Sequence, residues 1–301
     1  MKIKISALTD VGKERTNNED AFIYCSNLLQ QDWSVASATD YVELGDLGAL
    51  LVVADGMGGA NAGEVASALA IETVKKYFSI DRVKDTLVSG NDGIDVMLKE
   101  TVTAADDAIN KRMATDLETQ GMGTTIVICW ILKDGTTHIA WCGDSRCYTY
   151  NAATGLRRMT KDHSLVQELI DSGEITEEEA FNHPDNNIIT CGLGDFQAFP
   201  TPGIVCCELK ANDNVMLCSD GLCGYCTDDE IKRLFSAEYV DTEACCQKML
   251  DKALDAGGAD NIAIVMASLI DDNQEKPELL KRSFFKTFFQ KIFGGHKTSV
   301  N

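Results

Sequence analysis

The chain has 301 residues, 45% hydrophobic and 25% charged, which suits one large globular domain or two small ones. Its net charge of −20 argues against a nucleic-acid-binding surface, because such a surface needs clustered Lys and Arg. No apolar run is long enough to span a bilayer, and no basic start followed by an apolar stretch marks a signal peptide. Twelve cysteines without such a signal favour a reducing cytoplasm over a disulfide framework.

Hydrophobic periodicity predicts strands and two long helices in the first part of the chain. An apolar run at 50–54 is followed at once by Asp55 and a glycine-rich turn, so we expect Asp55 at the end of a buried strand. A polar, charged segment at 10–20 separates the first two strands. The predicted elements are strands at 2–8, 21–25 and 50–54 and helices at 62–78 and 92–117.

The rest of the chain is dominated by short strands. Capping-box patterns that begin at Ser164, Thr176 and Thr227 predict the starts of short helices. This mixture favours antiparallel sheets covered by helices, an α+β fold, over a series of βαβ units. The predicted elements are strands at 124–132, 136–142, 147–150, 156–159, 204–209, 215–218 and 262–269 and a helix at 242–256.

Acidic residues recur where predicted strands begin or end. Oxygen ligands fixed at strand ends are what a hard divalent cation requires, and clustered carboxylates without a cation would repel one another. The four histidines show no metal-binding spacing, so Mg²⁺ or Mn²⁺ fits better than zinc. The alternative, that these residues only form surface turns, stays open at this point. The acidic residues are Glu19, Asp20, Asp55, Asp144, Asp220 and Asp260.

Several short motifs make the sequence similar to a known family. The chain resembles the metal-dependent serine/threonine protein phosphatases of type 2C, in their bacterial form. Each motif is weak alone, but together they follow the family's order along most of the chain. They are RTNNED at 15–20, VADGMGG at 53–59, GMGTT at 121–125, GDSR at 143–146, KDHS at 161–164, SDG at 219–221 and DN at 260–261.

The resemblance implies a four-layer αββα sandwich over residues 1–272, with two antiparallel sheets face to face and helices outside both. It implies hydrolysis of phosphoserine and phosphothreonine by a metal-activated water, with two Mn²⁺ or Mg²⁺ ions per active site and a third, weaker ion. Two cations can activate water at neutral pH and stabilise the developing charge. The implied partners are phosphorylated proteins, a Ser/Thr kinase and that kinase's substrates, and no nucleic acid.

The resemblance also implies roles for individual residues. Asp55 would bridge both metals, and Arg15 would hold the phosphate, to which its forked guanidinium is suited. The implied ligands are Glu19 and the Gly56 carbonyl for one metal, Asp220 and Asp260 for the other, and Asp144 for the third.

The chain departs from the family at three positions. Met57 stands where many eukaryotic members have a His proposed as general acid, so the source of the leaving-group proton is open. Gly224 replaces an Asp that helps to hold the third metal, and Cys191 replaces a common Arg. The segment 166–187 resembles the variable flap that borders the active site.

Two alternatives to a protein phosphatase remain. One is a pseudophosphatase that binds phosphoproteins without turnover, against which the intact Arg15 and acidic residues argue. The other is a hydrolase of small phosphate esters or nucleotides, although segment 56–63 has no P-loop Lys. Cys223 and Cys226 form a single Cys-x-x-Cys. We interpret them as inert loop thiols rather than as a redox pair or half of a zinc site.

The last segment, 273–301, differs from the body of the chain. Its basic residues alternate with an aromatic stripe, which predicts an amphipathic helix. This tail could cover an apolar patch of its own domain, lie on an anionic membrane surface or dock on a partner. We therefore expect a cytoplasmic protein that is either free or peripheral at the membrane.

Overall fold

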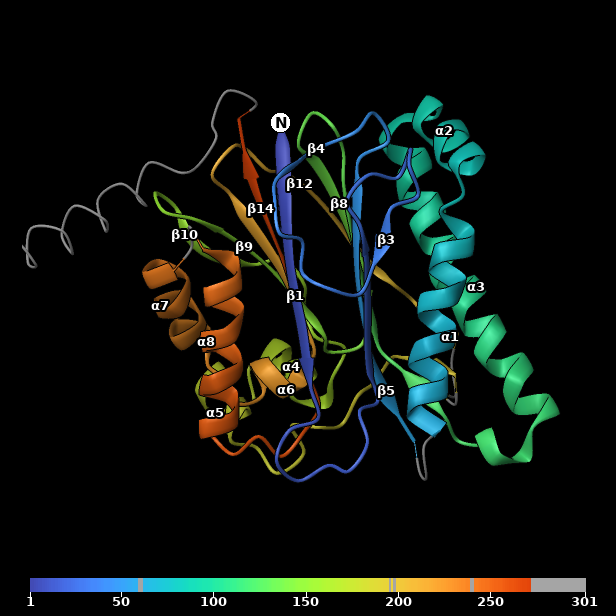
Figure 1. The fold of residues 1–301 in the computed structure, drawn as a ribbon. Coiled ribbons are helices and arrows are strands. Elements are labelled where there is room, and N and C mark those ends of the chain that lie inside the picture. The colour runs from blue at the N-terminus through green and yellow to red at the C-terminus, as the bar shows by residue number, and fades with distance from the viewer. Residues whose placement is uncertain (59–61, 195, 197–198, 239–240, 272–301) are drawn as a thin grey trace, which may run out of the picture.

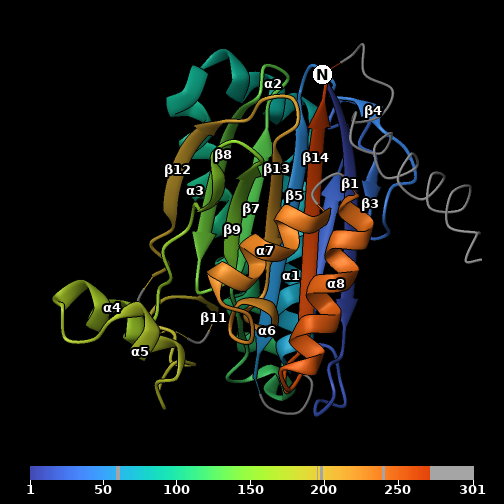
Figure 2. The ribbon, with the colours of Figure 1, turned by 90° about the vertical axis from the view of Figure 1, so that its left-hand side faces the viewer.

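The computed structural model describes residues 1–58, 62–194, 196, 199–238 and 241–271. Two antiparallel β-sheets pack face to face, and helices cover the outer face of each sheet (Figures 1 and 2). The predicted αββα sandwich is therefore confirmed. The predicted boundary between a domain at 1–272 and a tail at 273–301 stays a prediction, since the tail lies outside the described residues.

The first sheet has six strands, and its centre is β14. All nine residues of β14 are buried, because its faces are covered by the second sheet and by helices. It pairs with β13 on one side and with β1 on the other, with Ile3 opposite Leu269. The order is β10 (Gly155–Arg158), β9 (Arg146–Asn151), β13 (Asn214–Cys218), β14 (Ile262–Ile270), β1 (Lys2–Asp10) and β4 (Val42–Glu43).

The second sheet has eight strands and is built around β5. This strand pairs with β2, β6 and β7. Gly56 and Met57 pair with β6, so β5 continues past Asp55, and the prediction of a turn directly after Asp55 was wrong. The strands are β2 (Asp20–Cys25), β3 (Trp33–Ser34), β5 (Ala49–Met57), β6 (Gly123–Thr124), β7 (Ile126–Ile131), β8 (Thr136–Cys142), β11 (Leu193–Gly194) and β12 (Gly203–Glu208).

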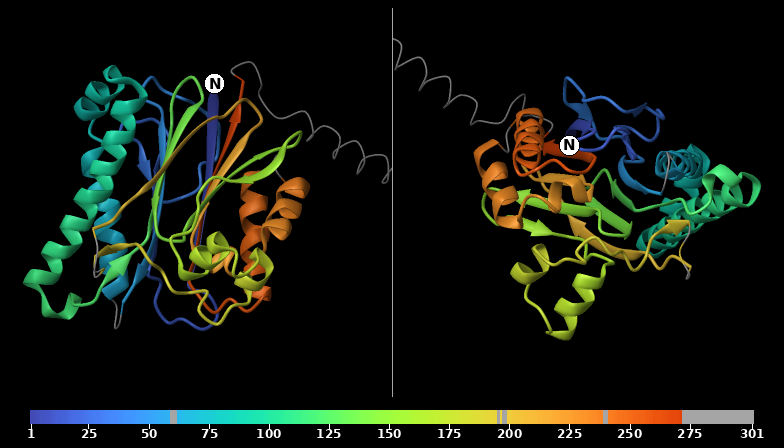
Figure 3. Two further views of the ribbon diagram at one scale, coloured as in Figure 1. Left: turned by 180° about the vertical axis from the view of Figure 1, so that it is seen from behind. Right: turned by 90° about the horizontal axis from the view of Figure 1, so that it is seen from below.

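Helices form the two outer layers. The N-terminal helices lie against the eight-stranded sheet and the C-terminal ones against the six-stranded sheet, whereas α4 and α5 project from one end of the sandwich (Figures 2 and 3). The helices are α1 (Ala62–Tyr77), α2 (Ile80–Val88), α3 (Gly90–Thr115), the 3₁₀ turn η1 (Leu117–Thr119), α4 (Leu165–Ser172), α5 (Glu177–Phe181), α6 (Asp220–Cys223), α7 (Asp228–Glu238) and α8 (Thr242–Asp255).

The layers bury three hydrophobic clusters. The middle cluster lies between the two sheets and includes Leu51, Val53 and Val265. The two outer clusters lie under the helices, one around Trp130 and the other around Phe235. The alternating side chains of β5 enter the middle cluster and one outer cluster, which holds this strand rigidly on both faces.

The sequence missed α2, α6 and the two-residue strands, and it misjudged one cap. Thr176 and Thr227 each form a complete capping box with a Glu three residues later. At Ser164 only half of the box forms, because the Gln167 side chain donates to Asp171 instead of turning back to the N-cap. Among the described helices, none combines the length and apolar character needed to cross a membrane.

Candidate active site

Six acidic residues come together at one edge of the sandwich, where β5 ends and β14 begins, at the lower end of Figure 1. Two lie at the start of β2, one in β5, one in the connection from β8 to β9, one at the start of α6 and one just before β14. Both sheets therefore contribute to the group. The six are Glu19, Asp20, Asp55, Asp144, Asp220 and Asp260.

The electrostatics of these carboxyl groups reflect their closeness. Burial and repulsion by four neighbouring carboxylates raise the pKa of Asp55 well above its usual value. Burial, followed by the charges of Asp220 and Asp260, raises the pKa of Asp20 to about 8. Burial and Asp260 raise the pKa of Asp220 to about 6. The ionised carboxylates therefore repel one another, and bound cations would relieve this repulsion.

The backbone around Asp55 is held by two threonines. Its carbonyl oxygen accepts hydrogen bonds from the Thr125 amide at 2.9 Å and from the Thr124 hydroxyl at 2.8 Å. Its amide donates to Thr125 Oγ1 at 3.1 Å, and that hydroxyl lies 2.7 Å from Ser145 Oγ. The GMGTT and GDSR motifs thus support the backbone of Asp55 and link it to the loop that carries Asp144.

Close backbone packing explains the glycine after Asp55. A Cβ on Gly56 would lie 2.3 Å from the carbonyl oxygen of Gly63 and 2.6 Å from that of Glu19. Both distances are below the contact limit, so only glycine lets these three chain segments meet. The Gly56 amide also donates to the Glu19 carbonyl at 3.2 Å, which fixes the predicted metal-binding segments relative to each other.

Asn261 connects Glu19 with the segment before β14. Its Oδ1 accepts a hydrogen bond from the Glu19 amide at 2.8 Å. Its Nδ2 donates to the carbonyl oxygens of Val11 and Asn17, each at 2.9 Å. One amide side chain therefore holds the polar segment 10–20 beside Asp260.

Arg15 pairs with one of the predicted metal ligands. Its Nη2 lies 2.9 Å from Asp260 Oδ2, and its side chain is 51% exposed. Asp260, followed by Glu19 and Asp220, makes the guanidinium harder to deprotonate and so raises the pKa of Arg15, against the smaller effect of burial. The Arg15 guanidinium thus lies at the open side of the acidic group, where a phosphate can reach it.

A second arginine supports the loop of Asp144 from inside. Arg146 donates from Nε and Nη2 to both carboxylate oxygens of Asp162 and from Nη1 to the Tyr148 hydroxyl. Its charge partly offsets the rise in the pKa of Asp144, which burial and Asp220 cause. Within the described chain, Asp144 Oδ1 is buried without a hydrogen-bond partner. Such an oxygen needs a ligand, and a cation fits it.

The six residues lie close together, but they do not form a compact metal cage. Among the described residues, no three of their carboxylates place oxygens within 4.8 Å of one another; Cys142, His163 and Cys191 are the group that meets this distance. Asp260 instead pairs with Arg15. The crowded acids and the unpartnered Asp144 oxygen nevertheless fit hard divalent cations.

Two of the residues that depart from the family pattern have a clear setting. The Gly224 amide donates to the Asp220 carbonyl at 2.6 Å, and a Cβ there would lie 2.8 Å from the same oxygen. A larger residue would therefore require the first turn of α6 to shift. Met57 is half-buried in the last position of β5. Cys223 and Cys226 are both buried in the cluster under α7 and α8, as expected of inert thiols.

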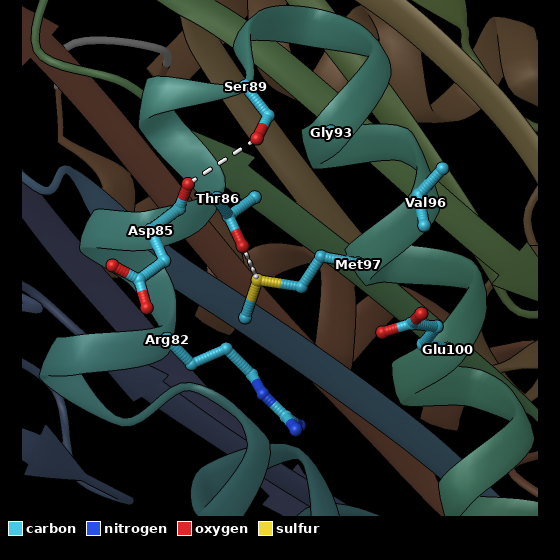
Figure 4. Close-up of a pocket in the computed structure, with 8 residues that line it drawn as sticks. All are labelled: Arg82, Asp85, Thr86, Ser89, Gly93, Val96, Met97 and Glu100. Carbon is cyan, nitrogen blue, oxygen red and sulfur yellow. Dashed lines mark hydrogen bonds between the residues drawn. The ribbon is translucent and has the colours of Figure 1, made fainter.

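A separate depression of about 470 Å³ lies between α2 and α3. Its lining mixes charged, small and apolar side chains, including Arg82, Asp85, Met97 and Glu100 (Figure 4). The helix α2 lies at the end of the sandwich opposite the start of β14 (Figure 1). This depression therefore does not belong to the acidic group.

The sequence alone missed several residues that organise the site. Ser219 donates a 2.6 Å hydrogen bond to Asp20, and Ser67 donates one of the same length to the Glu19 carbonyl. Ser219 and Asn261 lie next to predicted ligands within matched motifs, which was a usable signal. Ser67 had no such signal, because its role depends on how α1 packs against β2.

Comparisons with known proteins agree with this arrangement. A family model described as protein phosphatase 2C matches residues 25–263. The chain is 32% identical to serine/threonine phosphatase stp of Listeria monocytogenes, covering 72% of this chain and 83% of that protein. It is also 32% identical to the phosphatase PstP of Mycobacterium tuberculosis over 89% of its length, although it spans only 45% of that relative.

A solved structure shares the fold. The catalytic domain of PstP in complex with two manganese ions matches with a TM-score of 0.69 at 29% identity, covering 90% of this chain and 99% of that chain. The match of the family model over most of the chain confirms the resemblance drawn from the motifs. The chain therefore belongs to the protein phosphatase 2C family of serine/threonine phosphatases.

Proposed function

We propose that the chain hydrolyses phosphoserine and phosphothreonine in proteins with the help of two divalent cations, Mn²⁺ or Mg²⁺. The observation that carries the proposal is the convergence of six acidic residues from both sheets on one edge, with a buried Asp144 oxygen that lacks a partner in the described chain. The manganese ions in the related PstP domain support the choice of cation.

The proposed ligands are those that the family resemblance implies, and their positions on the fold support them. Asp55 lies at the centre of the group and would be shared by both ions, with Glu19 and the Gly56 carbonyl on one side and Asp220 and Asp260 on the other. Asp144 would serve a third, weaker ion. When bound, the ions would supply charge neutralisation and a water of lowered pKa. The threonine and asparagine hydrogen bonds described above keep the ligands in register.

Arg15 would bind the phosphate. In the structure it pairs with Asp260, and a cation bound to Asp260 would compete for that carboxylate. The guanidinium would then be available to hold two non-bridging phosphate oxygens in a bidentate way. Since half of its side chain is already exposed, this change needs little rearrangement.

The proposed partners are phosphorylated proteins, including a Ser/Thr kinase and that kinase's substrates. The projecting α4 and α5, which form most of the flap predicted at 166–187, extend from the sandwich (Figure 3). They would offer a surface for a protein substrate. We also propose that the protein is located in the cytoplasm, free or peripheral at the membrane. Residues 273–301 would dock on the membrane surface or on a partner. The pseudophosphatase alternative is not favoured, because Arg15 and all the acidic positions are present.

The test is hydrolysis of a phosphothreonine peptide by the full chain. We expect phosphate release with Mn²⁺ or Mg²⁺, none with excess chelator, and a loss of at least about 100-fold in Asp220→Asn, since removal of one key electrostatic group costs this much. Asp46→Asn, which changes a surface carboxylate paired with Lys133, is the matched control and should keep full activity.

Two results would count against the proposal. Full activity of a folded Asp220→Asn variant would show that the acidic group does not take part in the reaction. Faster hydrolysis of a nucleotide than of the peptide would favour the small-ester alternative. In Arg15→Ala we expect mainly a raised KM, because the phosphate would lose its bidentate contact.

A further inference from the structure

Three side chains outside the acidic group form a second cluster of reactive groups. Cys142 ends β8, His163 follows β10, and Cys191 lies between the flap and β11. The two sulfur atoms are 2.8 Å apart. A ring nitrogen of His163 and both sulfurs lie within 4.8 Å of one another, and no other set of three His, Cys, Asp or Glu in the described chain is as compact.

The two cysteines differ in access. Cys142 is fully buried, whereas Cys191 is partly exposed, so Cys191 is the more accessible of the two residues to a reagent. Hydrogen bonds from Cys142 and then His163 stabilise the thiolate and lower the pKa of Cys191 to about 4, against burial. Cys191 is therefore the nucleophile of the pair, with a protected thiol beside it.

The distance between the sulfurs and the number of ligand atoms bear on what the cluster can hold. Two thiolates on one tetrahedral zinc ion are separated by about 3.7 Å, as Zn–S bonds of about 2.3 Å require. A disulfide bond is about 2.0 Å long. The observed 2.8 Å lies between these two distances. The described residues offer three ligand atoms at this cluster, whereas a structural zinc ion takes four. The geometry therefore favours a disulfide over a metal site.

We propose that Cys142 and Cys191 are a modification site that closes to an intramolecular disulfide on reaction with a low-molecular-weight disulfide. The Cys191 thiolate attacks one sulfur of the reagent, forms a mixed disulfide and releases one thiolate. Cys142 then loses its proton to that released thiolate and attacks Cys191 Sγ, which releases the second thiolate. Together the two cysteines lose two electrons and one proton, and the reagent disulfide becomes one thiol and one thiolate.

The crosslink would join two segments that border the active site. Cys191 follows directly on the base of the flap, where Ser164 bridges Ile189 and the Thr190 amide donates to the His163 carbonyl at 2.9 Å. Cys142 lies two residues before Asp144. The inference concerns thiol chemistry and does not rest on the proposed phosphatase activity.

Other thiols in the described chain provide contrasts. Cys129 with Cys147, and Cys218 with Cys223, are pairs in which both members are buried, so a reagent reaches neither sulfur. Cys206 is exposed, and its sulfur lies 3.8 Å from His138 Nε2, yet it has no thiol placed against it as Cys142 is placed against Cys191. Cys206 can therefore form a mixed disulfide but cannot close it.

The experiment treats the folded full chain with glutathione disulfide, quenches it with an alkylating agent and maps the peptides by mass spectrometry. We expect a Cys142–Cys191 crosslink, two fewer free thiols among these positions, and full reversal by dithiothreitol. Cys142→Ala should stop at a stable glutathione adduct on Cys191. Cys191→Ser should give neither crosslink nor adduct at this cluster, and Cys206→Ser should crosslink like the wild type.

Several outcomes would overturn the proposal. One is a folded wild-type protein that keeps both thiols free while Cys206 is modified. Another is a crosslink that joins a different pair. A third is zinc bound at one ion per chain that protects both thiols and is lost in Cys191→Ser, which would make the cluster a metal site. Circular dichroism of each variant tests whether the fold is retained. Cys191 is partly exposed and Cys142 is buried, so the fold should tolerate a substitution at Cys191 better than one at Cys142.

Discussion

Arg146 and Asp162 form a largely buried ion pair beside the acidic group. Their side chains are 18% and 8% exposed, and the guanidinium contacts the carboxylate through two nitrogens. This charge also faces Asp144 and Asp220, so Arg146 offsets repulsion among acids that are close together. Loss of Arg146 would thus leave buried negative charge without a counter-charge.

We expect Arg146→Met to lower the free energy of unfolding by about 3–5 kcal/mol, because it leaves the buried Asp162 unpaired. Urea denaturation measures the change. Arg112→Met removes an exposed pair with Asp116 and should cost less than about 1 kcal/mol. Equal losses in the two variants would show that burial of the Arg146 pair does not matter.

Asp20 makes the stability of the metal-free protein depend on pH. Its pKa in the folded protein is raised to about 8 by burial, whereas an unfolded Asp has a pKa of about 3.9. Between these values the folded state holds a proton that the unfolded chain has released. The resulting stability is fully present below the unfolded pKa and is lost as the pH rises through about 8.

The measurement compares wild type with Asp20→Asn in chelator by thermal unfolding from pH 5 to pH 8. The variant cannot ionise at this position, so the stability of the wild type relative to the variant should fall as the pH rises. Groups that do not interact with Asp20 cancel in the difference, whereas Asp55 and Asp220 are coupled to it and contribute to the size of the change. A difference that is constant or grows with pH would mean that Asp20 is not protonated in the folded, metal-free protein.

At the scale of single residues, the sequence predicted which acidic residues form the site but not the residues that hold them in place. Asp55, Asp144, Asp220 and Asp260 could be grouped because each adjoins a predicted strand. The partners that hold them, such as Ser219 for Asp20 and Asn261 for Glu19, are distant in sequence. Hydrogen bonds over such separations leave no local pattern.

At the scale of elements, identical capping motifs have different surroundings. Thr176–Glu179 starts α5 in the projecting flap, where Ala180 is the buried residue of the helix. Thr227–Glu230 starts α7, which buries Ile231 and Phe235 in the cluster under the C-terminal helices. Loss of the N-cap should therefore lower the global free energy of unfolding for α7 but not for α5.

We expect Thr227→Ala to lower the global free energy of unfolding by about 1 kcal/mol, the usual value of an N-cap. Thr176→Ala should fray α5 locally and change the global value by less than about 0.5 kcal/mol, as for a surface substitution. Urea denaturation followed by circular dichroism measures both. A larger global effect of Thr176→Ala would mean that the flap unfolds together with the sandwich.

Long periodic elements could be predicted, and short ones could not. The helices α1, α3 and α8 and most strands of five or more residues were expected within a few residues of their observed bounds. The strands β3, β4, β6 and β11 have two residues each, too few for any period. The helix α2 is short, and Gly90, which separates it from α3 with a φ of +70°, was not recognised as a break.

Viewed as a whole, the molecule brings its acidic residues together only when both sheets are packed. A cation that binds this group should therefore stabilise the entire fold. At a metal concentration 100 times the dissociation constant, we expect a gain of about 2.7 kcal/mol over the chelated protein. Thermal unfolding with Mn²⁺ and with chelator measures this gain.

The matched variants for this prediction are Asp55→Asn and Asp46→Asn. The first removes the central carboxylate and should abolish the gain, whereas the second alters a surface ion pair and should keep it. An undiminished gain in Asp55→Asn would place the stabilising ion elsewhere on the molecule.

The class of the fold could be predicted, but its strand order could not. The mixture of short strands and helices indicated antiparallel sheets with helical covers. Nothing local shows that β14 lies between β13 and β1, since the register from Lys2 opposite Ile270 to Asp10 opposite Ile262 joins the two ends of the described chain. Such pairing depends on packing of the complete core.

The position of β14 also determines when the protein can become active during synthesis. The strand β1 is made long before β14, and until then its neighbour in the six-stranded sheet is the two-residue β4. Asp260 is made just before β14. A nascent or truncated chain that stops before residue 260 lacks both β14, which lies between β13 and β1, and one of the six acidic residues. Activity should therefore begin in a single step, when β14 leaves the ribosome and inserts.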